Sequence, residues 1–273
     1  MEIRYVGGPT AVLEIGGVRL LTDPTFDAPG DYPIGNRALT KTTGPAVEVS
    51  SLGPVDAVLL SHDQHPDNLD QAGRDHLASV PLTLSTQSAA ARLGGSVRAL
   101  PNWTSVTLGD GLTVTGVPAQ HGPDGTEHLV GEVTGFVLSG EGLPTVYVSG
   151  DNASLDVVRE VVKRVGPVDV ALLFAGGART PLVDGFLTLN SDDAVTAAEI
   201  LGAVRGAAAL RALGALHAGA GDGGEGVRRV RRPAAAAGAG RDHAPPLTRV
   251  LAATGGGSAR GETGSPSGPR LAG

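Results

Sequence analysis

The sequence predicts an α/β protein, and three observations support this. Short runs rich in Val and Leu alternate with segments of helical periodicity, which is typical of strands and helices packed in layers. The 273-residue chain is long enough for one large domain with a substantial core. It holds only four Phe, three Tyr and one Trp, so aliphatic side chains must fill that core.

Strands are expected where apolar residues run together or alternate with polar ones. The clearest such runs are residues Asp56–Leu60, Leu112–Val117 and Thr145–Gly150. Each run is followed by polar residues that could bind a metal. Because strand ends in a layered α/β protein share one edge of the sheet, these polar residues are expected to lie together.

Helical periodicity marks four segments: Leu69–Ala78, Gln87–Leu93, Ser154–Val165 and Ser191–Ala203. The third is the clearest, with Asn152 or Ser154 available as its N-cap. The fourth begins with Ser191 as N-cap and two acids in the first turn, where the helix dipole favours negative charge.

The stretch 61–70 carries the most chemistry, because it places two imidazoles and three carboxylates directly behind an apolar run. Its ligand candidates are His62, His65 and Asp67, while His121 and Asp151 follow the other two strands. Imidazole nitrogens and carboxylate oxygens suit Zn²⁺ or a similar first-row metal. The alternative for the stretch is a polar surface turn, and surface positions are also expected for His76 and His128.

In order along the chain, these segments resemble the metallo-β-lactamase superfamily of metal-dependent hydrolases, and within it the group similar to L-ascorbate-6-phosphate lactonase. The resemblance covers residues 1 to about 203. Residues Ile3–Ile15 and Leu20–Pro24 look like the family's first hairpin and its Thr-Asp-Pro turn. A Ser-His-x-His-x-Asp-His signature, a Pro-Ala-x-His strand end and a Ser-Gly-Asp strand end then follow. The resemblance implies an αββα four-layer sandwich.

This sequence departs from the signature at two positions. His65 lies three positions after His62 where the family has two, so Gln64 stands at the strict position of the second His. We take His65 as the ligand, since this register places Asp67 on the family Asp and Asn68 on the adjacent His. An amide is a weaker ligand than an imidazole, so a second metal position should be weaker or absent.

The resemblance also implies a division of roles. His62, His65 and His121 would hold one metal, which activates a water for attack on a carbonyl or phosphoryl centre. Asp151 would be a bridging carboxylate, and Asp67 a ligand or proton acceptor, so both belong to the catalytic set. For Asp23 two readings stand side by side: it orients a ligand by accepting a hydrogen bond, or it simply forms the Asp-Pro turn.

Composition excludes several classes. The chain has no Cys, which excludes a disulfide framework and thiolate ligands. It contains no run of about 18 apolar residues and no N-terminal signal pattern, so we expect a cytoplasmic protein without a membrane partner.

Charge and composition change near residue 204. Residues 1–204 hold 24 acidic and 11 basic residues, whereas residues 205–273 hold four acidic residues and ten Arg and are rich in Ala, Gly and Pro. We therefore expect a domain at 1–204 and a tail at 205–273. Such a tail is typical of disorder, or of nucleic-acid binding.

A frameshift offers another interpretation of the tail. Two Lys against 19 Arg indicate a GC-rich gene, which read out of frame yields Ala-, Gly-, Arg- and Pro-rich sequence. Shifted by one base, residues 209–218 are compatible with His-Phe-Glu-x-Trp-Ala-His-Phe-Thr, which looks like the family's closing metal-ligand segment. We favour a frameshift near 203–206, which would leave the fold incomplete at the C-terminus.

The leading interpretation is a metal-dependent hydrolase of a small ester, lactone or phosphoester, with one or two Zn²⁺ and with Mn²⁺ or Fe²⁺ as other suitable ions. One alternative is an inactive product that keeps the fold, and another is a nucleic-acid-associated protein that uses the basic tail. The acidic body argues against nucleic acid, so a small-molecule substrate is the expected partner.

Overall fold

A computed structural model describes residues 1–34, 37–202 and 207–210 of the chain. The strands are β1 Glu2–Gly7, β2 Thr10–Ile15, β3 Val18–Thr22, β4 Gly30–Ile34, β5 Arg37–Lys41, β6 Ala57–Leu59, β7 Thr83–Ser85, β8 Val97–Ala99, β9 Ser105–Leu108, β10 Leu112–Pro118, β11 Thr134–Ser139, β12 Val146–Val148, β13 Val170–Phe174 and β14 Ala207–Leu210. The α-helices are α1 Gln71–Leu77, α2 Gln87–Leu93, α3 Glu127–Val130, α4 Leu155–Val165 and α5 Ser191–Ile200, and a 3-10 helix spans Val49–Ser51.

Two six-stranded sheets form the centre of the molecule. The first has the order β1-β2-β3-β6-β7-β8, and the second has the order β14-β13-β12-β11-β10-β9. In each sheet one half is antiparallel and the other parallel, since β3 pairs β6 and β12 pairs β13 in parallel. The parallel strands β6 and β12 are the ones that lead into the polar loops of interest.

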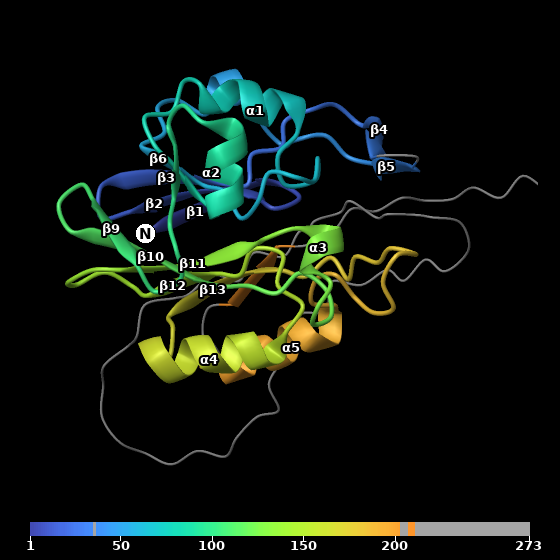
Figure 1. Ribbon diagram of the computed structural model, residues 1–273. Helices are drawn as coiled ribbons and strands as arrows, with labels where there is room; N and C mark the ends of the chain where they lie inside the picture. Colours follow the sequence, from blue (N-terminus) through green and yellow to red (C-terminus); the bar gives the residue numbers. More distant parts are fainter. Residues whose placement is uncertain (35–36, 203–206, 211–273) are drawn as a thin grey trace, which may run out of the picture.

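The layers follow the order helix, sheet, sheet, helix (Figure 1), with α1 and α2 over the first sheet and α4 and α5 over the second. An apolar cluster fills the space between the sheets, and a further cluster lies under each pair of helices. Aliphatic residues dominate all three clusters, as the low aromatic content predicts. The expected αββα four-layer sandwich is confirmed.

Local signals place most helices correctly. Ser154 is the N-cap of α4, because its side chain accepts a hydrogen bond from Val157 N. The prediction that Ser191 caps α5 is wrong: Asn190 caps it, and its Oδ1 accepts from the backbone N–H groups of residues 192 and 193. The short helix α3, which is not among the four predicted helices, carries His128.

Within the segment predicted to be a tail, residues 205–273, the structure describes residues 207–210. Strand β14 pairs with β13 in parallel, so residues 207–210 extend the second sheet within the segment assigned to the tail. The predictions of disorder, of nucleic-acid binding and of a frameshift otherwise fall on residues outside the described ranges.

Within the described ranges, the structure contains no helix long and apolar enough to cross a membrane.

Candidate metal centre

Three strand ends bring the polar residues together. β6 leads into Ser61 and His62, β10 is followed by His121, and β12 leads through Gly150 to Asp151. Gly150 has a φ of +56°, and a Cβ there would lie 2.4 Å from the carbonyl oxygen of Thr134. Only glycine fits this close approach of the chain, which turns Asp151 toward the histidines.

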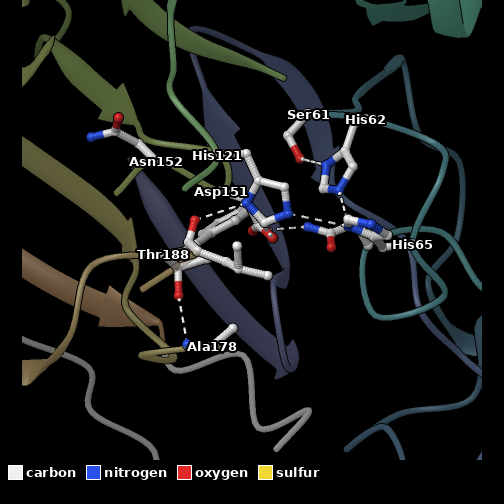
Figure 2. A network of polar contacts seen from close by, with 12 residues as sticks. Ser61, His62, His65, His121, Asp151, Asn152, Ala178 and Thr188 are labelled. Carbon is white, nitrogen blue, oxygen red and sulfur yellow. Dashed lines mark hydrogen bonds and ion pairs between the residues drawn. The ribbon is translucent and has the colours of Figure 1, made fainter. Parts of the chain in front are cut away.

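The residues His62, His65, His121 and Asp151 form one cluster, with one ligand atom from each lying within 4.8 Å of all the others. Nδ1 of His65 lies 2.9 Å from Nε2 of His62 and 3.3 Å from Nε2 of His121. Figure 2 shows the three rings turned toward one another. His62, His121 and Asp151 are buried, whereas His65 is half-buried.

The outer nitrogens of two rings have partners that fix their protons. Nδ1 of His121 lies 2.8 Å from the carbonyl oxygen of Leu187, which only accepts, so this nitrogen donates. Nδ1 of His62 lies 3.0 Å from Oγ of Ser61, whose hydroxyl donates to Oδ2 of Asp23 at 2.5 Å. Because that hydroxyl proton goes to Asp23, Ser61 accepts from His62. Both rings therefore direct an unprotonated Nε2 at His65.

The fit to a cation follows from this arrangement. Three imidazole nitrogens and one carboxylate oxygen converge, and at least two of the nitrogens present lone pairs. Burial lowers the pKa of all three histidines, which keeps the rings neutral, the form that binds metal. The set of nitrogen and oxygen donors suits Zn²⁺, Mn²⁺ or Fe²⁺.

Two buried carboxylates share the amide of Asn68. Its Nδ2 donates to Oδ2 of Asp23 at 2.9 Å and to Oδ1 of Asp151 at 3.1 Å, while its own Oδ1 is buried without a partner among the described residues. Burial raises the pKa of Asp23 to about 7, and burial followed by the charge of Asp67 raises the pKa of Asp151 to about 8. A cation beside these groups would stabilise their charged forms.

Asp23 lies in the turn after β3, with a φ of 24° that is rare for a residue other than glycine. Besides the Ser61 hydroxyl and the Asn68 amide, it accepts the backbone N–H of Ser61 at 2.6 Å. The sequence left two roles open for Asp23, the turn itself and the orientation of a ligand. Asp23 combines them: it lies in a strained turn, and it is connected to the candidate ligand His62 through the Ser61 hydroxyl.

Asp67 lies outside the four-residue cluster. It is half-buried, and it lines a neighbouring pocket whose wall includes Thr25, Tyr32 and Lys41. It is near enough for its charge to raise the pKa of Asp151. The structure therefore brings four of the seven predicted site residues together in the cluster, with Asn68 and Asp23 joined to it by hydrogen bonds and Asp67 beside it.

The other polar residues considered from the sequence, Gln64, His76 and His128, are not part of the cluster. Gln64 is exposed and lies against Gly131, where a Cβ would come within 2.1 Å of its Oε1, so Gln64 points away from the rings that His65 joins. His128 is exposed, and His76 is half-buried with its ring centroid 6.0 Å from that of Phe26.

The loop that follows β13 supports His121. Residues 176–189 are held by hydrogen bonds from Ala178 N to Oγ1 of Thr188 and from Leu189 N to the carbonyl oxygen of Asn152. Figure 2 shows Thr188 and Ala178 close to the ring of His121. Because Leu187 contributes only its backbone oxygen, no side-chain signal in the sequence could have identified it.

Comparison with known families identifies the domain. A family model described as a beta-lactamase superfamily domain matches residues 18–208. A Mycobacterium tuberculosis protein, "Uncharacterized protein Rv0906", is 29% identical over 215 residues, which cover 72% of this chain and 54% of the relative. The chain thus spans about half the length of this relative. A "UPF0173 metal-dependent hydrolase" of Pyrobaculum neutrophilum is 28% identical and matches over 66% of this chain and 74% of its own.

Solved structures share the fold. An isothiocyanate hydrolase from Delia radicum gut bacteria has a TM-score of 0.68 at 23% identity, covering 80% of this chain and 87% of its own. A possible metal-dependent hydrolase of Veillonella parvula has a TM-score of 0.66 at 19% identity, covering 76% and 84%. With the four-layer sandwich and the extent of the family match, the chain belongs to the metallo-β-lactamase superfamily.

Proposed function

We propose that this protein is a metal-dependent hydrolase of a small ester, lactone or phosphoester. The convergence of three neutral imidazole nitrogens with the carboxylate of Asp151 carries the proposal. The names of the Pyrobaculum and Pyrococcus relatives, which are metal-dependent hydrolases, support it. Zn²⁺ is the ion we expect first, because three imidazoles and one carboxylate are ligands that it commonly takes.

In this proposal His62, His65 and His121 bind the ion, and Asp151 supplies the oxygen ligand. A bound divalent ion would lower the pKa of a water and polarise the bond to be hydrolysed. The hydrogen bonds from His121 to Leu187 and from His62 to Ser61 keep both Nε2 atoms free of protons and oriented. Asn68 holds the carboxylate of Asp151 by donating to its Oδ1.

Asp67 is assigned the proton acceptor. Its half-buried carboxylate lies between the cluster and the neighbouring pocket, so it borders both the ion and the place where a substrate would enter. A carboxylate at this border can take a proton from the attacking water and return it to the leaving group.

Hydrolysis assays with simple substrates test the proposal. Purified protein loaded with Zn²⁺ is assayed on p-nitrophenyl acetate, γ-butyrolactone and bis(p-nitrophenyl) phosphate, beside His121→Ala as control. We expect Zn²⁺-dependent turnover of at least one substrate class, abolished in His121→Ala. Turnover that is equal in both proteins, or none with any class despite bound Zn²⁺, would contradict the proposed activity and favour the non-catalytic alternative.

A further inference from the structure

Between the two histidines of the loop lies Asp63, a buried carboxylate that is not one of the four cluster residues. Only 3% of its side chain is exposed. Arg92, in the last turn of α2, binds it in a bidentate manner: Nε lies 3.0 and 3.2 Å from the two carboxylate oxygens, and Nη2 contacts Oδ1. A guanidinium that binds both oxygens fixes the orientation of the carboxylate as well as its position.

The backbone of the same residue is held from a second helix. Nη2 of Arg74, in α1, donates to the carbonyl oxygen of Asp63 at 2.5 Å. Residue 63 is therefore fixed through its side chain by α2 and through its backbone by α1. The next residue, Gln64, is exposed, so the extra residue of this loop projects outward while Asp63 stays buried.

The rest of the loop is fixed by other contacts. Ser61 is held by Asp23 and by the backbone hydrogen bond from Thr134 N to the Ser61 oxygen, and the carbonyl oxygen of His65 accepts the N–H groups of Asn68 and Leu69. Among hydrogen bonds within the described part of the chain, Asp63 is the one position between His62 and His65 whose backbone has such support. The spacing of the two rings then depends on that residue.

We propose that Arg92 is a positioning residue for metal binding: through its bidentate pair with Asp63, and together with Arg74, it sets the distance between the rings of His62 and His65. This inference rests on the proposed function, because it assumes that both rings are ligands. It accounts for how a loop one residue longer than the family signature brings both rings into one cluster.

If Arg92 acted on the site only through its charge, removing it would change the metal affinity in the opposite direction from the loss of a positioning residue. Removing the positive charge of Arg92 near a cation site, and leaving Asp63 negative, should strengthen cation binding. Burial and the charges of the neighbouring rings and of Arg92 lower the pKa of His62, so the guanidinium already disfavours positive charge at this ring. Loss of positioning should instead weaken binding, since removal of groups that orient ligands commonly costs 10- to 100-fold in metal affinity.

The test measures Zn²⁺ affinity by competition with a chromophoric chelator. The variants are Arg92→Leu, Arg92→Lys, which keeps the charge without the bidentate fork, and the double variant Asp63→Asn/Arg92→Leu, which removes both charges. Arg98→Leu is the matched control, because Arg98 is exposed on β8 and its loss also removes one positive charge. Urea unfolding of each metal-free protein and the visible spectrum of its Co²⁺ form are recorded in parallel.

We expect at least a tenfold loss of Zn²⁺ affinity in all three Arg92 variants, an altered Co²⁺ spectrum, and an unchanged affinity in Arg98→Leu. Affinity that rises in Arg92→Leu, or that stays at the wild-type value in Arg92→Lys and in the double variant, would overturn the inference while leaving the proposed function intact. If Arg92→Leu does not fold because Asp63 is left unpaired, the other two variants decide. Wild-type protein that binds no Zn²⁺ would overturn the proposed function and this inference with it.

Discussion

Nε2 of His62 lies 2.9 Å from Nδ1 of His65, although the two rings come from positions three residues apart on a loop that carries an additional residue. Two neutral imidazole nitrogens at this distance form a hydrogen bond only if one of them carries a hydrogen. Since Ser61 fixes the proton of His62 on the outer nitrogen, either a proton on His65 or a cation must lie between the rings. The carboxylate of Asp151 beside them favours the cation.

Ser61→Ala tests the hydrogen bond that orients His62. The variant removes the hydroxyl between Nδ1 of His62 and Oδ2 of Asp23, so the ring loses both its fixed proton and its orientation. Zn²⁺ affinity should fall by about 10- to 100-fold. Ser79→Ala is the control, because Ser79 contacts the ring of His76 outside the cluster. Equal Zn²⁺ affinity of Ser61→Ala and the wild type would show that His62 needs no such support.

Asn68→Asp should make the metal-free protein depend on metal for its stability. The new carboxylate would face Asp23 and Asp151 in place of an amide that donates to both, so buried like charges would be unpaired. The free energy of unfolding without metal should fall by about 3 kcal/mol. Saturating Zn²⁺ should restore much of the loss, because binding to the folded state alone stabilises it. Thermal melts with and without Zn²⁺ measure this, and a variant as stable as the wild type without metal would contradict the role given to Asn68.

Asp67→Asn separates catalysis from metal binding. Asp67 lies outside the cluster of four ligand residues, so the variant should keep its Zn²⁺. If Asp67 accepts the proton of the attacking water, kcat on a substrate that the wild type hydrolyses should fall by about 10²- to 10⁴-fold. A loss of Zn²⁺ from the variant would instead make Asp67 a ligand.

Asp151→Asn gives a pH dependence of defined sign in the metal-free protein. Burial, with the charge of Asp67, raises the pKa of Asp151 to about 8, above its value in the unfolded chain of about 4. The raised pKa contributes stability that is complete below about pH 4 and is lost progressively as the pH rises to about 8. The advantage of the wild type over Asp151→Asn in urea unfolding should therefore shrink between pH 5 and pH 8.5. A constant difference would contradict the raised pKa.

The α/β class could be predicted because its signals are local, whereas the four-layer arrangement came from the family resemblance. The helix over residues 87–93 has the predicted bounds, and the ends of the others differ by a few residues at most. The N-cap of α5 was assigned one residue too late, since Asn190 and Ser191 are both good caps and only the backbone geometry selects between them. The parallel pairing of β3 with β6 and of β12 with β13 was not predicted, because parallel pairing has no local signal.

The candidate ligands could be predicted because each follows a strand that ends at the same edge. The sequence also suggested the register that makes His65 the ligand, and the structure places Gln64 outside the cluster. What the sequence could not show is the set of contacts that orient these residues. These contacts are made by Ser61, by the backbone oxygen of Leu187 and by the pair of Asp63 with Arg92. The two residues of each contact are 1 to 66 positions apart in the sequence, and none of the contacts belongs to a periodic pattern.

The most direct test of the central claim is the metal content of the purified protein, measured by elemental analysis beside a His62→Ala/His121→Ala double variant. We predict one tightly bound divalent ion per chain in the wild type and none in the double variant, because Asn68 takes up the carboxylates with which a second ion would be bound. A folded wild-type protein that retains no metal after incubation with Zn²⁺, or a double variant that retains the same amount as the wild type, would contradict the assignment of this cluster as a metal centre.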